Sequence, residues 1–433
     1  MADRLTARVA IVGGGYAGMA AAAELAARSI PVTVFEAARV LGGRARRVET
    51  DGIALDNGLH ILLGAYEETL RLIDLVRAPG EEIGLKRLPL ELTIHPEFRM
   101  QAPRLPAPLH LFFALLGARG LGLGDRLAAA RFMAWAQRNA SKLGADTTVA
   151  ALLTERKQPP AVSRFLWRPL CVSALNTPAG QASAQVFLNV LRDGLNSRRA
   201  HSDLLLPAMD FSALFPERAA RFVEGRGGSV RLGVTVESIQ RQADGFSIAG
   251  ESAPFSHVIL AVSPHRLGNL IESDDALADI ARKIDAFRYQ PIYSVYLQYS
   301  RDTRLPFGMG GLEAKYAQWV FDRGQLCNQP GLVGVVISAE GAHQDLPRDE
   351  LAQAVHAELL AHFPGLGKPQ WHQVIAEKRA TFACTPALAR PDNATPVRNL
   401  YLAGDYTASD YPATIEAAVR SGVRAARMVM QHD

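Results

Sequence analysis

The start of the chain alternates between apolar runs and small residues, a pattern typical of one strand–helix–strand unit. An apolar run at residues 9–12 is followed by a glycine-rich turn and an alanine-rich stretch that continues to Ala27. A second β-rich run, residues 32–35, follows the helix-breaking Pro31. Short uninterrupted apolar runs are typical of strands buried on both faces of a parallel sheet. The pattern therefore predicts a βαβ unit at the beginning of the chain.

The same alternation returns at the other end of the chain. Residues 399–403 form a strand-like run, and from Thr414 onward small apolar residues recur on one helical face while arginines lie off it. Two more β-rich runs, residues 230–239 and 255–262, lie near the middle. Because the elements of α/β folds assemble around one largely parallel sheet, we expect these separated runs to share one sheet.

The long segments between these runs are interpreted as inserted material. Residues 75–200 are largely apolar and helical, whereas the segment at 266–380 contains strand candidates at 293–297 and 332–337 and a helix at 351–363. The predicted fold class is α/β, with a discontinuous Rossmann-like domain and an inserted α+β domain. We assign residues 1–75, 205–265 and 380–433 to the first domain, and residues 76–204 and 266–379 to the second.

The glycine-rich turn of the first unit has the spacing of a dinucleotide-binding fingerprint. Gly13 permits a tight turn after the strand, Gly15 lets a pyrophosphate approach the backbone, and Gly18 lets the helix pack closely on the sheet. The helix N-terminus then offers free amides to the phosphates. Glu36 ends the second strand, where a carboxylate can accept hydrogen bonds from ribose hydroxyls. A ligand-free glycine turn is the alternative, but the complete βαβ context favours dinucleotide binding.

A second glycine pair follows Glu36 directly. Gly42, Gly43 and Arg44 combine backbone amides with a cation, which suits the same pyrophosphate. A solvated basic loop shared with Arg46 and Arg47 is the alternative interpretation. Because proteins that bind only NAD do not need this second element, the arrangement favours FAD as the cofactor.

The third candidate element lies near the C-terminus. A strand that ends in Gly404 and Asp405 can bring a carboxylate to ribityl hydroxyls, and Thr414 and Ile415 open a helix whose N-terminal amides can face a flavin carbonyl. The alternatives are a turn residue for Asp405 and a simple helix-start position for Thr414.

Composition and charge exclude several classes of protein. The chain has 433 residues and a net charge of only +4 at pH 7, with no long basic tract, so we expect no nucleic-acid partner. Its three cysteines, Cys171, Cys327 and Cys384, are far apart and predict neither disulfides nor a metal site. Few residues precede the first strand, so no export signal is predicted and a cytoplasmic location fits best.

One apolar segment, residues 105–117, invites two interpretations. It is interrupted by prolines and is shorter than the roughly 20 residues of a membrane-spanning helix. Phe112, Phe113, Leu115 and Leu116 lie within it, and it is flanked by Arg99, Arg104, Arg119 and Arg126. The region 104–121 is therefore either a monotopic contact with the inner face of the cell membrane or a helix of the protein core.

These motifs together resemble a known family. The three glycine elements resemble the flavin amine oxidase and phytoene desaturase superfamily. The segments at 42–47, 55–64, 169–177 and 402–422 (GGRARR, LDNGLHILLG, PLCVSALNT and LAGDYTASDYPATIEAAVRSG) resemble more narrowly the squalene-associated FAD-dependent desaturases, whose characterised members are hydroxysqualene dehydroxylases. The resemblance runs from Val9 to about Met428.

The resemblance implies how FAD is held. Contacts to the adenosine diphosphate half are implied for Gly13, Gly15, Gly18, Glu36, Gly43 and Arg44, and the backbone of Val236, in the predicted strand 230–239, is implied to meet the adenine. Asp405 and Ile415 match positions near the ribityl chain and the flavin carbonyl. Thr414 stands where many amine oxidases carry an aromatic residue, which disfavours amine oxidation. Cys384 is interpreted as a small buried residue, so non-covalent FAD is expected.

The resemblance also implies a reaction. It is the removal of an allylic hydroxyl from hydroxysqualene to give squalene, by hydride transfer from N5 of reduced flavin to an allylic cation in an apolar tunnel. His60 is the candidate proton donor, with a structural histidine as the alternative, and Asp56 is interpreted as a turn or cap residue. An isoprenoid substrate and an unidentified electron donor are the expected partners. The alternatives are a carotenoid-type desaturase and a non-catalytic prenyl-binding protein.

Overall fold

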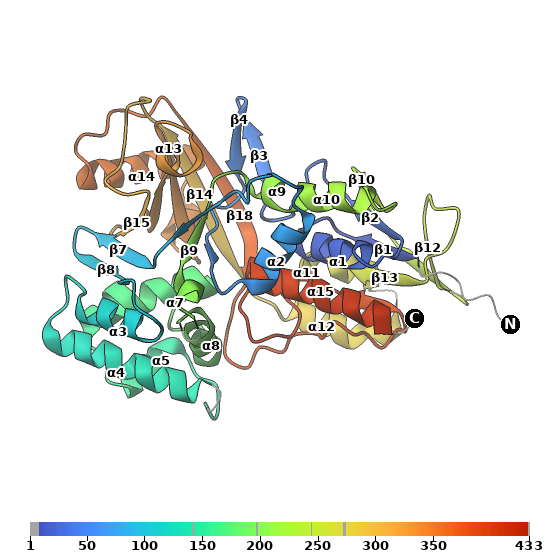
Figure 1. Ribbon diagram of the computed structural model, residues 1–433, viewed down its shortest axis with the longest axis horizontal. Helices are drawn as coiled ribbons and strands as arrows, with labels where there is room; N and C mark the ends of the chain where they lie inside the picture. Colours follow the sequence, from blue (N-terminus) through green and yellow to red (C-terminus); the bar gives the residue numbers. More distant parts are fainter. Residues whose placement is uncertain (1–7, 141–142, 196–197, 244, 272–273, 432–433) are drawn as a thin grey trace.

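A parallel sheet and a mixed sheet form the two halves of the molecule (Figure 1). The computed structural model describes residues 8–140, 143–195, 198–243, 245–271 and 274–431. The parallel sheet has the strand order β10-β2-β1-β13-β19. Its strands come from three distant parts of the chain: β1 (Val9–Val12), β2 (Val32–Glu36), β10 (Ser229–Leu232), β13 (His257–Leu260) and β19 (Leu400–Leu402). All four of its strand pairings are parallel, and the α/β fold class is confirmed.

Alternate residues of these strands face opposite helical layers. On one face, Val9, Ile11 and Ile259 pack with α1 (Tyr16–Ala26), α10 (Pro216–Glu224) and α15 (Ile415–Gln431). The first and last of these helices touch closely, because a Cβ added at Gly422 would lie 2.0 Å from the carbonyl oxygen of Ala17. The two ends of the chain therefore form one layer of the same domain.

The opposite face of the parallel sheet is covered by helices that the sequence assigned to the inserted domain. Val12, Val258 and Leu260 share an apolar cluster with Leu267, Ile280 and Ile284 of α11 (Pro264–Ile271) and α12 (Ala278–Asp285). Both helices lie in the right-hand half of Figure 1. The chain therefore stays with the parallel sheet up to residue 285 before it enters the second sheet, whereas the expected domain boundary was at residue 265.

The expected strand at residues 230–239 is wrong. β10 ends at Leu232, and Gly233 turns the chain with a φ of +72°. Val236 lies in the following loop, partly buried, before a separate antiparallel hairpin of β11 (Ile239–Gln242) and β12 (Gly245–Ile248). The β-branched residues of this segment predicted a strand, but the left-handed glycine prevents a continuous one.

The second half contains a mixed sheet of seven strands, in the order β18-β14-β17-β16-β15-β7-β8. The strands predicted at 293–297 and 332–337 and the helix predicted at 351–363 are confirmed as β14 (Tyr289–Gln298), β17 (Leu332–Ser338) and α14 (Arg348–His362). Both inserted segments contribute strands to this sheet. The other strands are β7 (Glu91–His95), β8 (Phe98–Gln101), β15 (Met309–Leu312), β16 (Trp319–Asp322) and β18 (Trp371–Phe382).

A helical region packs below this sheet in Figure 1. Trp167, Cys171 and Phe187 are completely buried in its core. Within the part of the chain that the structure describes, no helix is both long and apolar enough to cross a membrane. The helices are α3 (Leu109–Leu116), α4 (Leu123–Asn139), α5 (Val149–Glu155), α6 (Pro160–Val162), a π-helical turn (Ser163–Trp167), α7 (Arg168–Leu175) and α8 (Ala184–Leu195).

Short elements join the two halves. The hairpin of β3 (Arg47–Thr50) and β4 (Ile53–Asp56) follows the second glycine pair, and β9 (Leu204–Pro207) pairs with β5 (Leu62–Leu63) and β6 (Leu85–Leu88). The remaining elements are α2 (Glu67–Val76), α9 (Phe211–Leu214), α13 (Arg323–Cys327) and the 3₁₀ turns Arg199–Ser202, Asp275–Leu277 and Ala342–Asp345. Together these connections hold the loops that carry the candidate site.

Candidate functional site

The first glycine turn lies at the carboxyl end of β1, where ligands of parallel sheets bind. Gly13 has a φ of +114°, which favours glycine, and its N–H donates to the carbonyl of Phe35 over 2.8 Å. A Cβ at Gly18 would lie 1.9 Å from the carbonyl oxygen of Gly13. These two glycines are therefore required by the fold itself.

Gly15 has a different reason to be glycine. Its φ of −75° suits any residue, and an added Cβ would meet only Gly43, at 3.7 Å from the Cα atom of that residue. The turn is also joined to the second glycine pair, because the N–H of Gly42 donates to the carbonyl of Gly14 over 3.0 Å. The bare backbone of Gly15 and Gly43 forms a cradle open to the N-terminus of α1, which fits a bound pyrophosphate.

The Glu36 carboxylate is held beside this cradle. Its two oxygens accept hydrogen bonds from the N–H groups of Gly14, at 2.5 Å, and Ala38, at 2.8 Å. The loop that contains Val236 passes the same point, because the N–H of Val234 donates to the carbonyl of Glu36 over 2.9 Å. The loop that contains Val236 therefore begins beside Glu36, although Val236 is not in a strand.

Arg44 connects the second glycine element to the C-terminal one. Its Nη2 lies 2.5 Å from Oδ1 of Asp405, and its Nη1 donates to the carbonyl of Ala380 over 2.6 Å. Burial alone would lower the pKa of Arg44, but the charge and hydrogen bond of Asp405 outweigh it and the pKa is raised. The guanidinium therefore stays charged, and three distant chain segments meet at one point.

The C-terminal element provides a buried polar strand end. Asp405 is 5% exposed, and the N–H of Gly404 donates to the Ser421 hydroxyl over 2.9 Å. Thr414 caps the last helix, since its hydroxyl accepts from the N–H of Ala417 over 3.2 Å. Ile415 is the first residue of that helix. The C-terminal element therefore combines a buried carboxylate, that of Asp405, with the N-terminus of a 17-residue helix.

Two buried polar atoms fit a bound group in this region. The Tyr406 hydroxyl, close to Asp405 and Arg44, has no hydrogen-bond partner among the described residues. Nε2 of His60 is likewise buried and makes no hydrogen bond to the described part of the chain. Buried polar atoms are seldom left unpaired in a finished site. With the glycine cradle, the Glu36 carboxylate and the Arg44–Asp405 pair, these atoms fit FAD.

His60 lies in the loop between β4 and β5. His60 is partly exposed as a residue, and its ring packs against Phe211, with ring centroids 5.1 Å apart. Burial, and then the charge of Arg44, lower the pKa of His60 from 6.5 to about 4. The imidazole is therefore neutral near pH 7.

A small cavity lies beside His60. Its volume is only about 10 Å³, far below the roughly 300–1,000 Å³ of ordinary ligand pockets. Most of its walls are apolar, and it lies between elements of the two halves. The lining residues are Leu59, His60, Leu206, Pro207, Phe321, Arg323, Leu326 and Cys327.

The structure overturns the interpretation of Asp56 as a turn or cap residue. Its carboxylate is 1% exposed, accepts from the N–H of Phe211 over 3.0 Å, and forms an ion pair with Nη1 of Arg323 at 3.1 Å. Burial raises the pKa of the Asp56 carboxyl, and Arg323 offsets part of that rise. The hydroxyl of Tyr296 also donates to the Asp56 carbonyl over 2.7 Å. This pair fixes the start of the loop that leads to His60.

Sequence analysis missed Arg323 for a plain reason. It follows the strand β16 by one residue, and nothing in its surroundings marks it as different from other arginines. Only the three-dimensional fold brings it to Asp56, which is 267 residues away in sequence.

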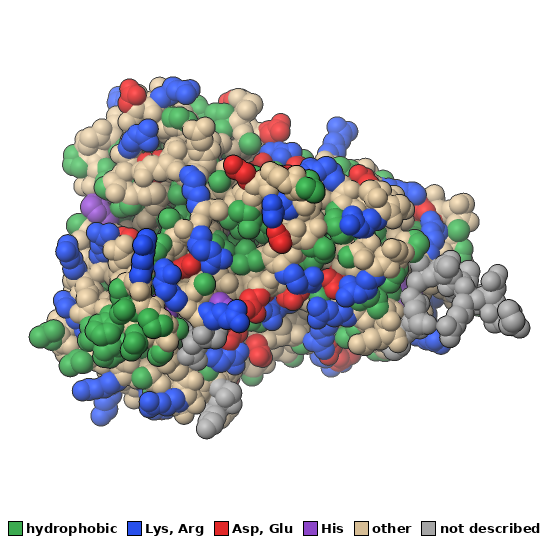
Figure 2. Space-filling view, in the orientation of Figure 1, with side chains coloured by type: hydrophobic (Ala, Val, Ile, Leu, Met, Phe, Trp, Pro, Cys, Tyr) green, Lys and Arg blue, Asp and Glu red, His purple; other side chains and the backbone are tan. Residues whose placement is uncertain are grey.

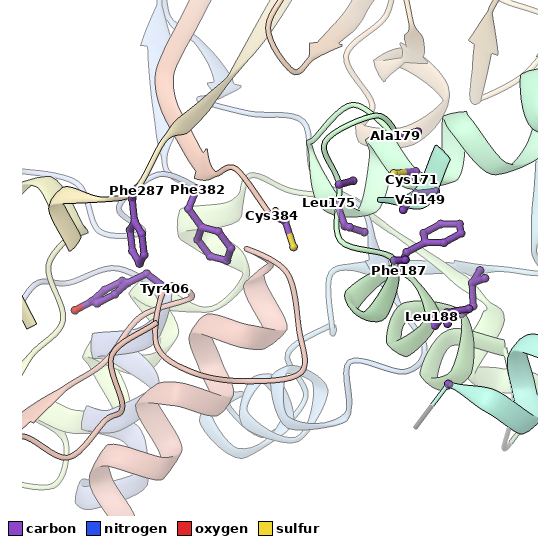
Figure 3. Close-up of a cluster of buried hydrophobic side chains, with 14 of the residues drawn as sticks. Val149, Cys171, Leu175, Ala179, Phe187, Leu188, Phe287, Phe382, Cys384 and Tyr406 are labelled. Carbon is purple, nitrogen blue, oxygen red and sulfur yellow. The ribbon is translucent and has the colours of Figure 1, made fainter. Parts of the chain in front are cut away.

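Cys384 lies in an apolar cluster, as predicted. Figure 3 shows it beside Phe382, in a cluster that continues to Cys171 and Phe187 of the helical region. Burial raises the pKa of the Cys384 thiol to about 12. A thiol in this setting stays protonated and unreactive, which suits a packing role and not covalent attachment of a cofactor.

Comparison with known proteins agrees with this geometry. Residues 16–430 match the family of flavin containing amine oxidoreductases. The chain is 29% identical to hydroxysqualene dehydroxylase from Rhodopseudomonas palustris, over 98% of each protein. It is 24% identical to 15-cis-phytoene desaturase from Synechococcus elongatus, over 98% of this chain and 96% of that protein.

The fold is shared with solved oxidases. Cyclohexylamine oxidase from Brevibacterium oxydans superposes with a TM-score of 0.69 at 17% identity, over 99% of both chains. The resemblance stated from the sequence is confirmed, and a non-catalytic prenyl-binding protein is no longer a tenable alternative. The chain therefore belongs to the flavin-containing amine oxidoreductases and is an FAD-dependent oxidoreductase.

Proposed function

We propose that this oxidoreductase removes the allylic hydroxyl of hydroxysqualene and releases squalene. The carbon–oxygen bond breaks with its electron pair, and the departing hydroxyl takes up a proton and leaves as water. A hydride then forms the new carbon–hydrogen bond. The substrate gains two electrons in this reaction, so a separate electron donor has to return two electrons to the enzyme in each cycle.

The full-length similarity to a hydroxysqualene dehydroxylase carries this proposal. The cavity beside His60 supports it, because its walls are mostly apolar and the charge of Arg323 is neutralised by Asp56. Such a site suits a hydrocarbon chain with one reactive polar group. The cavity is too small for a C30 chain, so binding requires its walls, formed by the end of β9 and by α13, to move apart.

The cofactor contacts follow the arrangement of the three glycine elements. We assign the adenosine diphosphate half to the first two elements and the adenine to the backbone of Val236. The ribityl and flavin half is assigned to the third element. When bound and reduced, FAD supplies the hydride. The residues proposed to hold it are Gly13, Gly15, Gly18, Glu36, Gly42, Gly43, Arg44, Val236, Gly404, Asp405, Thr414 and Ile415.

We assign transfer of the proton to His60. With a pKa of about 4, its imidazolium is a strong proton donor, although it is scarce at neutral pH. The rate should therefore rise as the pH falls toward 4. Asp56 and Arg323 act as positioning residues, because their ion pair holds the chain four residues before His60.

A carotenoid-type desaturase is the second candidate. It is favoured by the similarity to the phytoene desaturase, which also extends over nearly the whole chain. Such an enzyme would oxidise a hydrocarbon, so electrons would flow from the substrate to the cofactor. The identity of 24% is lower than the 29% of the hydroxysqualene dehydroxylase, which places this candidate second.

One experiment separates the two candidates. The FAD-loaded protein is reduced without oxygen, mixed with hydroxysqualene, and assayed for squalene and for return of the oxidised flavin spectrum. We expect one squalene per flavin oxidised. A protein that leaves hydroxysqualene intact, but converts phytoene into a longer polyene when an electron acceptor is added, would contradict the proposal.

A further inference from the structure

A patch of exposed apolar side chains lies on the helical region. Five large residues contribute to it, and they are 44–75% exposed. In Figure 2 the patch is the green area at lower left, over α3 and the start of α4, with arginine and lysine side chains around it. It consists of Leu109, Phe112 and Phe113 on α3 and Leu123 and Leu127 on α4. These five residues are called the apolar patch below.

Helix α3 has features of both interpretations of residues 105–117. Leu109, Phe112 and Phe113 have the spacing of one helical face, and they point outward. His110, Ala114 and Leu115 are buried on the opposite face. Leu115 therefore belongs to the core and not to the surface contact expected for it. The helix has one face in the core and one face free.

The patch is held in a fixed position. Arg126 donates from Nε to the carbonyl of Leu121 and from Nη1 to the carbonyl of Leu116, both over 2.9 Å, which ties α4 to the end of α3. The rings of Phe112 and Phe113 meet edge to face, with centroids 5.5 Å apart. The anchored helices therefore keep these side chains at the surface.

The surroundings of the patch are strongly basic. Residues 98–140 contain six arginines and a single acidic residue, Asp125. Arg131 continues the face of Leu123 and Leu127 at intervals of four residues. The arginines that are exposed and make no ion pair with any described residue are Arg104, Arg119, Arg131 and Arg138. Of the flanking set expected from the sequence, Arg99 instead pairs with Glu91, and Arg126 is used within the fold.

We propose that the apolar patch docks on an anionic lipid bilayer. Aromatic and leucine side chains inserted at the interface, with arginines level with the lipid headgroups, are the arrangement of monotopic surface helices. The choice of a bilayer over a protein partner rests on charge complementarity, because unpaired arginines surround apolar side chains that project from two anchored helices. Binding to the bilayer does not depend on the proposed reaction.

The patch is also connected to the cavity. His110, on the buried side of α3, lies 3.1 Å from the hydroxyl of Ser202, two residues before β9. Leu206 and Pro207 of that strand line the cavity beside His60. If the proposed function is right, β9 therefore links the buried side of α3 to the walls of the cavity that would receive the lipid substrate.

Vesicle flotation of the FAD-loaded full chain tests the docking. We expect binding to vesicles of phosphatidylcholine mixed with phosphatidylglycerol, and much weaker binding to phosphatidylcholine alone. The double variant Phe112→Ser/Phe113→Ser should weaken binding by roughly tenfold or more. Arg104→Gln and Arg119→Gln should each weaken it by about fivefold, with the loss reproduced by high salt.

Leu360→Ser is the matched control, because Leu360 is 40% exposed on α14, which lies above the mixed sheet in Figure 1, whereas the patch lies below it. It should bind vesicles as the unchanged protein does. Equal binding by the double phenylalanine variant would overturn the proposal, and so would a protein dimer that forms through the patch and leaves the vesicles unbound. The double phenylalanine variant should turn over detergent-dispersed hydroxysqualene as the unchanged protein does. A failure of docking is therefore distinguishable from a failure of the proposed reaction.

Discussion

The glycine cradle and the cavity beside His60 are built in different ways. The cradle is fixed by backbone contacts, such as the close approach of Gly18 to Gly13, that leave no room for a side chain. The cavity is held by side chains from distant segments, with the Asp56–Arg323 ion pair at its edge. A backbone-built site imposes glycines at fixed spacing, whereas a side-chain-built site can use many combinations. Substitutions in the two regions should therefore have different effects on stability, FAD content and turnover.

The largest effect is expected from Gly18→Ala. The new Cβ would lie 1.9 Å from a backbone carbonyl oxygen, so α1 would have to move away from the sheet. We expect a loss of at least about 4 kcal/mol in the free energy of unfolding, which is at the upper end of the losses caused by single substitutions. FAD should be lost at the same time. Urea unfolding and the flavin content of the purified protein measure both effects.

Gly15→Ala and Gly124→Ala are the controls for that substitution. At Gly15 the new Cβ has an ordinary contact of 3.7 Å, and at Gly124, on α4, it meets nothing within 4 Å. Gly15→Ala should fold normally but hold less FAD, because its methyl group enters the cradle. Gly124→Ala should change neither property. Equal FAD content in the Gly15 and Gly124 variants would remove Gly15 from the proposed site.

The next largest effect concerns the buried ion pair. Asp56→Ala leaves Arg323 without its partner and removes the acceptor for the N–H of Phe211. We expect a loss of about 3–5 kcal/mol in the free energy of unfolding. Denaturant titration measures it, and the flavin content should fall much less than in the Gly18 variant.

The double variant Asp56→Leu/Arg323→Met sharpens this result. It removes both charges together and should recover much of the stability, because a neutral apolar pair carries no desolvation penalty. Turnover should remain low if the pair positions the loop of His60. Full turnover in the double variant would show that the pair matters for stability alone.

A smaller effect is expected from the titration of His60. The folded protein holds the pKa of His60 near 4, below its ordinary 6.5, so the unfolded chain binds this proton more readily. The free energy of unfolding should therefore fall as the pH drops from about 6.5 to about 4, by on the order of 2 kcal/mol after allowance for the partial exposure of His60. His60→Gln should remove this part of the pH dependence.

The same variant tests the proposed proton transfer. Loss of a positioned acid should lower kcat by about 100-fold or more and should abolish the rise in rate at acidic pH. Pre-steady-state reoxidation of the reduced protein by hydroxysqualene measures this directly. If the rate of the His60→Gln variant has the same pH dependence as that of the unchanged protein, His60 has a structural role only.

The smallest effect is expected at the start of the last helix. Thr414→Ala removes the cap on the N–H of Ala417 and should cost about 1 kcal/mol of stability. Thr414→Ser keeps the hydroxyl and should restore most of it. Thermal unfolding of the three proteins provides the comparison, and equal midpoints for all three would contradict a capping role.

Sequence reasoning was strong where backbone sterics decide the structure. The tight glycine turn after β1 and the parallel sheet shared by the two ends of the chain could be predicted, because each needs particular residues at particular spacings. It was weak where long-range packing decides. The Asp56–Arg323 pair joins residues 267 apart, and no local pattern reveals it. A single left-handed residue, Gly233, was enough to move Val236 out of its predicted strand.

The proposed direction of electron flow is tested most directly by isotope transfer. The reduced FAD-loaded protein is allowed to react with hydroxysqualene in D₂O without oxygen, and the squalene is examined by mass spectrometry. Hydrogen bound to a nitrogen of reduced flavin exchanges with water, so the account predicts squalene with one deuterium at the carbon that carried the hydroxyl. Unlabelled squalene, or a conjugated polyene in its place, would contradict it.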